Sequence, residues 1–152
     1  MRPDWNRYFM EMALVVAKRS TCLRRQVGAV LVKDRHILAS GYNGAPTGMI
    51  HCNVTGCLRQ EQQVPSGQRH EICRGLHAEQ NAIIQAAYHG TAVNGGHLYV
   101  THQPCVICAK MIINAGVTEV FTLGDYPDPL AERMLIEANI HMTMMEPIHT
   151  GE

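Results

Sequence analysis

The sequence predicts a three-layer α/β/α sandwich, in which helices cover both faces of one central mixed five-stranded sheet. Chain length is the first observation, because 152 residues (1–152) are enough for a single domain with a substantial core. Composition is the second: 46% of the residues are hydrophobic and 17% are charged, as in ordinary globular proteins. The third is an alternation of β-prone runs with helical stretches of about three turns, which implies crossovers between parallel strands.

The first three elements follow from local patterns near the N-terminus. Asp4 is suited to cap a helix, because a short acidic side chain can accept hydrogen bonds from the first free N–H groups. Apolar residues then recur at helical spacing, at Trp5, Tyr8, Phe9, Met12, Ala13 and Val16. The β-prone runs 27–33 and 36–42 are separated only by a short polar pair, so they predict a hairpin.

Residues 43–75 have no clear hydrophobic period and are rich in glycine, proline and polar residues. A loop of this length is uncommon inside a compact domain and is usually functional or pinned in place. Regularity returns with a helix over 78–89 that ends at Gly90, and a helix over 104–115 with Pro104 near its start and Gly116 past its end. Strands over 97–101, 118–123 and 140–145 and a helix over 130–138 complete the prediction.

Charge and hydropathy limit the partners. The formal net charge is zero, whereas a nucleic-acid-binding protein usually carries a positive excess, so we expect no nucleic-acid partner. The N-terminus lacks the apolar core of a signal peptide and no run approaches transmembrane length, so we expect a cytoplasmic protein without a membrane partner. Lys18, Arg19, Arg24 and Arg25 form a cationic cluster without a neighbouring acid, which is either a solvated face or a small phosphate site.

Two predicted helix starts carry titratable side chains. His77 and Glu79 begin one helix, and Cys105 and Cys108 begin the next. Helix N-termini of βαβ units gather at one edge of the sheet, and residues at i and i+3 share a helical face. The N-terminal dipole also favours thiolates. One histidine and two cysteines match a catalytic zinc with its fourth position open to water, and Glu79 is placed to reach that water.

Taken alone, the C-x-x-C motif and Glu79 each have a common explanation other than catalysis. A lone C-x-x-C can be a redox pair or half of a structural zinc site, and Cys108 alone can be a small core residue. Glu79 alone can be a helix N-terminal acid stabilised by the dipole. The combination of H-A-E and P-C-x-x-C at a spacing of 28 residues is specific, because H-x-E…P-C-x-x-C is the signature of zinc nucleobase deaminases.

The motifs "HAEQNAI", "THQPCVICAK", "VGAVLVKD" and "GYNGAPTG" together resemble the deoxycytidylate (dCMP) deaminases of the cytidine deaminase-like superfamily, most closely the small bacterial and competence-operon type. The resemblance runs from residue 5 to about residue 145. It implies zinc-dependent hydrolysis of dCMP to dUMP and ammonia in pyrimidine nucleotide metabolism, by a homohexamer that dCTP and dTTP regulate. In such a mechanism zinc lowers the pKa of water, and Glu79 moves the released proton to ring N3 and later to the leaving amine.

Substrate contacts follow from the resemblance and from charge. Asn43 is implied to contact the deoxyribose 3′-hydroxyl, although an asparagine before Gly44 can also be a plain turn residue. Arg24 or Arg25 is expected to bind the phosphate. Ala78 is expected to line the pocket. Tyr126 is another expected pocket wall, or else a turn aromatic at the sheet edge.

Two other functions are compatible with the same sequence motifs. One is a different deaminase of the same superfamily, acting on a nucleoside or on tRNA adenosine. The other is a non-enzymatic zinc module, against which Glu79 argues because a purely structural site has no use for a carboxylate beside an open metal position.

The four remaining cysteines suggest a second, structural zinc that pins residues 43–75. Phage dCMP deaminases carry such a zinc, with two cysteines that match Cys22 and Cys52 and two histidines shortly before the catalytic one. By this resemblance the ligands here are Cys22, Cys52, His70 and Cys73, with Cys57 as the substitute. The alternatives are buried apolar thiols or, less in keeping with a reducing compartment, a disulfide.

Overall fold

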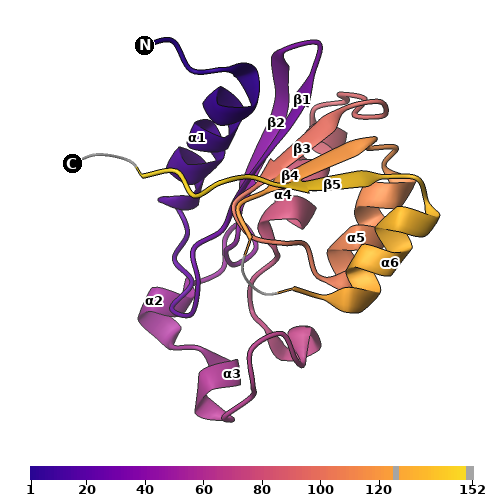
Figure 1. Ribbon diagram of the computed structural model, residues 1–152. Helices are drawn as coiled ribbons and strands as arrows, with labels where there is room; N and C mark the ends of the chain where they lie inside the picture. The colour runs from indigo at the N-terminus through magenta and orange to yellow at the C-terminus, as the bar shows by residue number, and fades with distance from the viewer. Residues whose placement is uncertain (125–126, 150–152) are drawn as a thin grey trace.

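The computed structural model describes residues 1–124 and 127–149, and it has the three layers that the sequence predicts (Figure 1). The sheet has five strands in the order β2-β1-β3-β4-β5. Their bounds are β1 Gly28–Lys33, β2 His36–Tyr42, β3 His97–Val100, β4 Glu119–Thr122 and β5 His141–Met144.

The sheet is mixed, which confirms the predicted fold class. The predicted hairpin is present, because β1 pairs antiparallel with β2. β3, β4 and β5 run parallel to one another. β1 also pairs antiparallel with β3, so β2 and β3 run in the same direction with β1 between them. The connection from β2 to β3 is therefore a crossover that passes over one strand.

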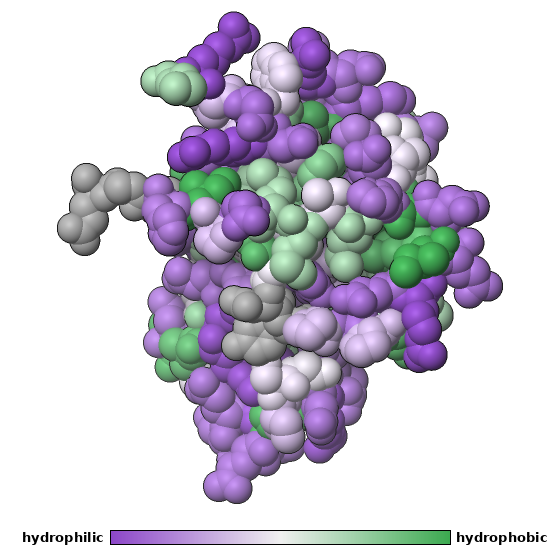
Figure 2. Space-filling model, viewed as in Figure 1, coloured by the Kyte–Doolittle hydropathy of each residue, from purple (hydrophilic) through white to green (hydrophobic). Residues whose placement is uncertain are grey.

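Helices cover both faces of this sheet. On one face α1 (Trp5–Ala17) buries Phe9, Met10 and Ala13 against strand residues that include Tyr99. On the other face lie α4 (Ala78–Tyr88), α5 (Val106–Asn114) and α6 (Pro129–Glu137), whose alanine-rich surfaces form the larger core with β1, β3 and β4. None of the described helices is long and apolar enough to cross a membrane. Hydrophilic side chains cover most of the face shown in Figure 2.

Aspartate caps place two of these helices. The Asp4 carboxylate accepts a hydrogen bond from the Arg7 N–H at 2.9 Å, as the sequence predicts. Asp128 precedes α6, and its Oδ1 accepts from the N–H groups of Leu130 and Ala131. Its Oδ2 accepts from the Val106 N–H at 2.9 Å, so one carboxylate holds the starts of α5 and α6 together.

The irregular segment 43–75 folds into short pieces beyond one end of the sheet (Figure 1). It contains α2 (Cys52–Thr55), α3 (Leu58–Glu61) and one 3-10 turn (His70–Ile72). Its two ends meet, because the N–H of Gly44 donates to the carbonyl of Leu76 at 3.2 Å and the N–H of Leu76 donates back at 2.9 Å. The segment is therefore an excursion that leaves and re-enters the domain at one point.

The contact between β2 and α4 leaves no room for a side chain at Gly41. A Cβ there would overlap the backbone of Ala78 and Ala82. We expect Gly41→Ala to lower the free energy of unfolding by about 1–3 kcal/mol, because overpacking forces a backbone shift. Gly44→Ala is the control, since its Cβ would come no closer than 3.7 Å to the Tyr42 ring. Equal stability of the two variants in chemical denaturation would contradict the expectation.

Candidate active site

Three potential metal ligands meet where α4 and α5 begin. His77 directly precedes α4, Cys105 directly precedes α5, and Cys108 lies in the first turn of α5. The Nδ1 atom of His77 lies 3.5 Å from the Sγ of Cys105 and 3.3 Å from the Sγ of Cys108. The Oε1 atom of Gln80 accepts from the His77 N–H at 2.8 Å and so holds this helix start in place. The structure therefore brings His77, Cys105 and Cys108 together, as the sequence predicts.

The protonation of the two thiols suits a cation. The hydrogen bond from Cys108, followed by that from His77, lowers the pKa of Cys105 to about 4 against the opposing effect of burial. The same bond to Cys105, together with burial, raises the pKa of Cys108. The hydrogen bond with Cys105 raises the pKa of His77. The site thus already holds one thiolate, and a soft divalent cation would take the place of the shared protons. One nitrogen and two sulfur donors are ligands that zinc prefers.

Glu79 lies beside this cluster in the first turn of α4 and is only 5% exposed. Burial raises the pKa of its carboxyl group, and the charge of His77 opposes this shift. A raised pKa makes the carboxylate a stronger base, which favours its uptake of a proton. Glu79 is therefore suited to proton transfer next to the three ligands.

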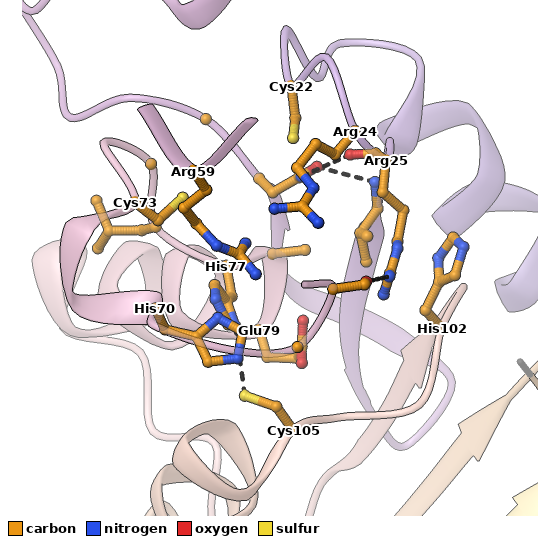
Figure 3. A pocket seen from close by; sticks show the side chains of 18 of the residues that line it. Cys22, Arg24, Arg25, Arg59, His70, Cys73, His77, Glu79, His102 and Cys105 are labelled. Atoms are coloured by element: carbon orange, nitrogen blue, oxygen red, sulfur yellow. Dashed lines mark hydrogen bonds between the residues drawn. The ribbon is translucent and has the colours of Figure 1, made fainter. Parts of the chain in front are cut away.

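A cavity of about 700 Å³ opens onto the cluster, a size suited to a small-molecule ligand. Figure 3 shows Arg24 and Arg25 across the cavity from Glu79 and Cys105, and Arg59 close to His77. The predicted substrate residues that line it are Asn43, Ala78, Arg24 and Arg25. Tyr126 lies outside the described residues, so its predicted place in the pocket wall stays a prediction.

Asn43 has a structural role in addition to its place in the cavity wall. Its Oδ1 accepts from the Val27 N–H at 2.8 Å, and its Nδ2 donates to the Arg25 carbonyl at 2.7 Å. The side chain therefore ties the end of β2 to the segment before β1. An amide oxygen has a second lone pair and an amide nitrogen a second hydrogen, so these bonds are compatible with a sugar contact.

Among the cavity residues that the sequence did not predict as substrate contacts are Arg59, Gln103 and His70, of which His70 was predicted only as a ligand of the structural zinc. Arg59 comes from α3, and Gln103 lies in the connection from β3 to α5. The His70 ring packs edge-on against that of His77 at 4.7 Å between centroids, and one ligand atom each of His70, His77 and Cys105 lie within 4.8 Å of one another. Burial, followed by the charge of His77, lowers the pKa of His70. No periodicity or motif marks Arg59, and Gln103 stands within the quoted motif "THQPCVICAK" without a role that its spacing indicates.

His70 is a geometric competitor for the third place at the metal centre. Cys108 is the third ligand that the C-x-x-C spacing predicts: its sulfur lies 3.3 Å from His77 Nδ1, and the residue is buried in the first turn of α5. The His70 ring packs against that of His77 and also lines the cavity.

The other four cysteines lie in or near the wall of the same cavity. Burial raises the pKa of Cys52, and the charges of Cys73, Cys22 and Cys57 raise it further, so these thiols are neighbours. Cys22, Cys52 and Cys73 line the cavity. All six cysteines are free thiols, without a disulfide. Cys57 is thus near Cys52, whereas the His70 ring packs against that of His77. Among the described residues, no three of these four sulfur atoms all lie within 4.8 Å of one another.

Comparison with known proteins agrees with this geometry. Residues 3–123 match the model of the cytidine and deoxycytidylate deaminase zinc-binding region. ComE operon protein 2 of Bacillus subtilis is 39% identical over 146 residues, which cover 95% of this chain and 73% of that protein. The deoxycytidylate deaminase of Schizosaccharomyces pombe is 43% identical over 119 residues, but the match spans only 37% of that enzyme and 78% of this chain.

A solved structure shares the fold. The dCMP deaminase of cyanophage S-TIM5, in complex with dCMP and dUMP, superposes with a TM-score of 0.80 at 32% identity. The superposition covers 95% of this chain and 99% of the phage enzyme. The zinc-binding region matched over residues 3–123, the relatives and the convergence of His77, Cys105 and Cys108 lead to one conclusion: this chain belongs to the cytidine and deoxycytidylate deaminase family.

Proposed function

We propose that this protein hydrolyses dCMP to dUMP and ammonia at a zinc centre formed by His77, Cys105 and Cys108. One observation carries the proposal: His77 Nδ1 faces both sulfurs, at 3.5 and 3.3 Å, next to a buried glutamate. Relatives with this activity and a homologous structure that holds dCMP and dUMP support the choice of substrate.

The proposed reaction requires one water molecule and two proton transfers. A zinc ion bound by these ligands would activate the water for attack on C4 of the cytosine ring. Glu79 accepts the proton that the water loses and delivers it to ring N3. It then transfers the second water proton to the amine, so that the C4–N bond breaks and ammonia leaves. Burial raises the pKa of Glu79, which makes its carboxylate a better proton acceptor for the first transfer.

The phosphate side of the substrate would lie among the arginines. Arg24 and Arg25 line the cavity as the sequence analysis proposed, and the Arg25 side chain donates to Ser66 Oγ at 2.7 Å. Asn43 and Ala78 complete the proposed substrate contacts. Regulation by dCTP and dTTP, assembly into a homohexamer and a cytoplasmic location remain predictions.

The first test concerns Glu79. We expect Glu79→Gln to keep the fold and the zinc content but to lower kcat by at least about 10²-fold, because the amide cannot accept the proton. Glu132→Gln, an acid in the first turn of α6, is the matched control and should keep wild-type turnover. A Glu79→Gln enzyme with a tenth of wild-type turnover would show that another group moves the proton.

The second test concerns the substrate. Ammonia release should be measured with cytidine, deoxycytidine, dCMP and an anticodon stem-loop. We expect dCMP to have the highest kcat/KM, because arginine contacts to phosphate are lost with the nucleosides. A preference for the stem-loop would identify a tRNA deaminase instead, and a protein that binds zinc but releases no ammonia from any substrate would be a non-enzymatic zinc module.

We also propose a second, structural zinc held by Cys22, Cys52 and Cys73. Of the two candidates for the fourth ligand, His70 and Cys57, we favour Cys57. The charge of Cys57 acts on Cys52, whereas the His70 ring packs against His77. A closed four-ligand site would pin the excursion 43–75 and stabilise the folded chain directly.

Metal analysis tests this site. We expect about two zinc ions per chain in protein purified without chelator, one in each site. Cys57→Ser should lose one of them, and His70→Ala should retain both. Loss of a zinc in His70→Ala but not in Cys57→Ser, with dCMP hydrolysis retained, would restore His70 as the ligand of the second site. One zinc per chain in the wild type would exclude that site.

A further inference from the structure

Arg59 is a cation buried inside the cavity. The residue is only 9% exposed, although it belongs to a four-residue helix in the irregular segment. Its Nε donates to the Gln68 carbonyl at 3.0 Å, which fixes one edge of the guanidinium group. Its Nη2 is buried and has no hydrogen-bond partner among residues 1–124 and 127–149. Burial of an unpaired donor and of a charge is costly, so this edge is suited to a ligand.

A second arginine, Arg24, also has a buried guanidinium nitrogen: its Nη1 has no hydrogen-bond partner in the described part of the chain. Both residues line the cavity, and Figure 3 shows their guanidinium groups pointing into the same space, across from Glu79. Two like charges held close together in a partly buried space repel each other unless an anion lies between them.

The acids that line the cavity do not supply this anion. Asp128 accepts hydrogen bonds from three backbone N–H groups at the starts of α5 and α6. Glu79 interacts with the Cys108 thiol at the proposed metal centre. Within the described ranges the ion pairs are Arg7–Glu11 and Arg69–Glu71, which involve neither Arg24 nor Arg59.

We propose that Arg59 is a specificity residue that binds the 5′-phosphate of the substrate together with Arg24. This inference rests on the proposed function, and it adds a residue of the irregular segment to the substrate site. A phosphate dianion offers several acceptor oxygens, enough for the exposed edges of two guanidinium groups. The Nε–Gln68 bond holds Arg59 in place before the nucleotide arrives, so little side-chain freedom is lost on binding.

The excursion 43–75 thereby has a substrate-binding role. Arg59 lies two residues after Cys57, and the Arg25–Ser66 hydrogen bond joins the same excursion to the segment before β1. Arg59 therefore reaches the cavity wall although its helix lies outside the central sheet.

Substitution of Arg59 tests the inference through the choice between nucleotide and nucleoside. We expect Arg59→Gln to lower kcat/KM for dCMP by at least about tenfold, as for loss of a charge-assisted phosphate contact. The kcat/KM for deoxycytidine should change by less than about threefold, because the nucleoside lacks the phosphate. Arg74→Gln is the matched control: Arg74 Nε also anchors this segment, to the Ile50 carbonyl at 2.7 Å, but Arg74 does not line the cavity. This control should keep the wild-type ratio of the two constants.

Two results would overturn the role of Arg59. One is an unchanged dCMP-to-deoxycytidine ratio in Arg59→Gln, and the other is an equal loss for both substrates, which would indicate a structural role. If Arg59→Gln does not fold, Arg59→Lys decides, since it keeps the charge and should show a smaller loss confined to dCMP. Failure of the proposed function is distinguishable, because the wild-type protein itself would then release no ammonia from dCMP.

Discussion

The meeting of two helix N-termini is the constraint on which the site depends. His77 and Cys105 are each the residue before a helix, and their side chains approach only if α4 and α5 start at the same edge of the sheet. Three features secure this placement. Gly41 lets α4 lie directly on β2, Gln80 holds the backbone of His77, and Asp128 joins the starts of α5 and α6. The ligands are thus positioned by packing and caps that lie outside the site.

Electrostatics divides the cavity into two halves. On one side lie acidic groups and thiols: Glu79, whose carboxyl pKa is raised by burial, and Cys105, whose thiol pKa is lowered to about 4. Arg24 lies across the cavity and Arg59 beside His77, and each has one buried Nη atom with no hydrogen-bond partner within the described residues. A cation suits the first half and an anion the second. A nucleotide that carries its reactive ring at one end and its phosphate at the other matches this division.

The excursion 43–75 connects these two halves to the cysteines outside the metal centre. It returns to its starting point through the Gly44–Leu76 hydrogen bonds, so its short helices do not extend the sheet. It contributes Arg59 and His70 to the cavity and Cys52, Cys57 and Cys73 to the thiol cluster. The backbone hydrogen bonds within this segment are short-range turns, such as those from the Gly56 N–H to the Cys52 carbonyl and from the Val64 N–H to the Arg59 carbonyl. A metal cross-link would join these separate turns to one another.

The sequence by itself determined the local elements and the chemistry of the metal centre. The hairpin and the individual helices follow from caps and periodicity, and H-x-E and P-C-x-x-C are each local motifs. That both motifs belong to one centre was predicted from their combination, which is a known signature. Only the tertiary structure decided that β1 lies between β2 and β3, that Asn43 ties β2 to the segment before β1, that His70 packs on His77 and that Arg59 enters the cavity. These contacts join residues far apart in the chain or in a segment without a period. Their geometry depends on the packing of the whole domain, which no local pattern encodes.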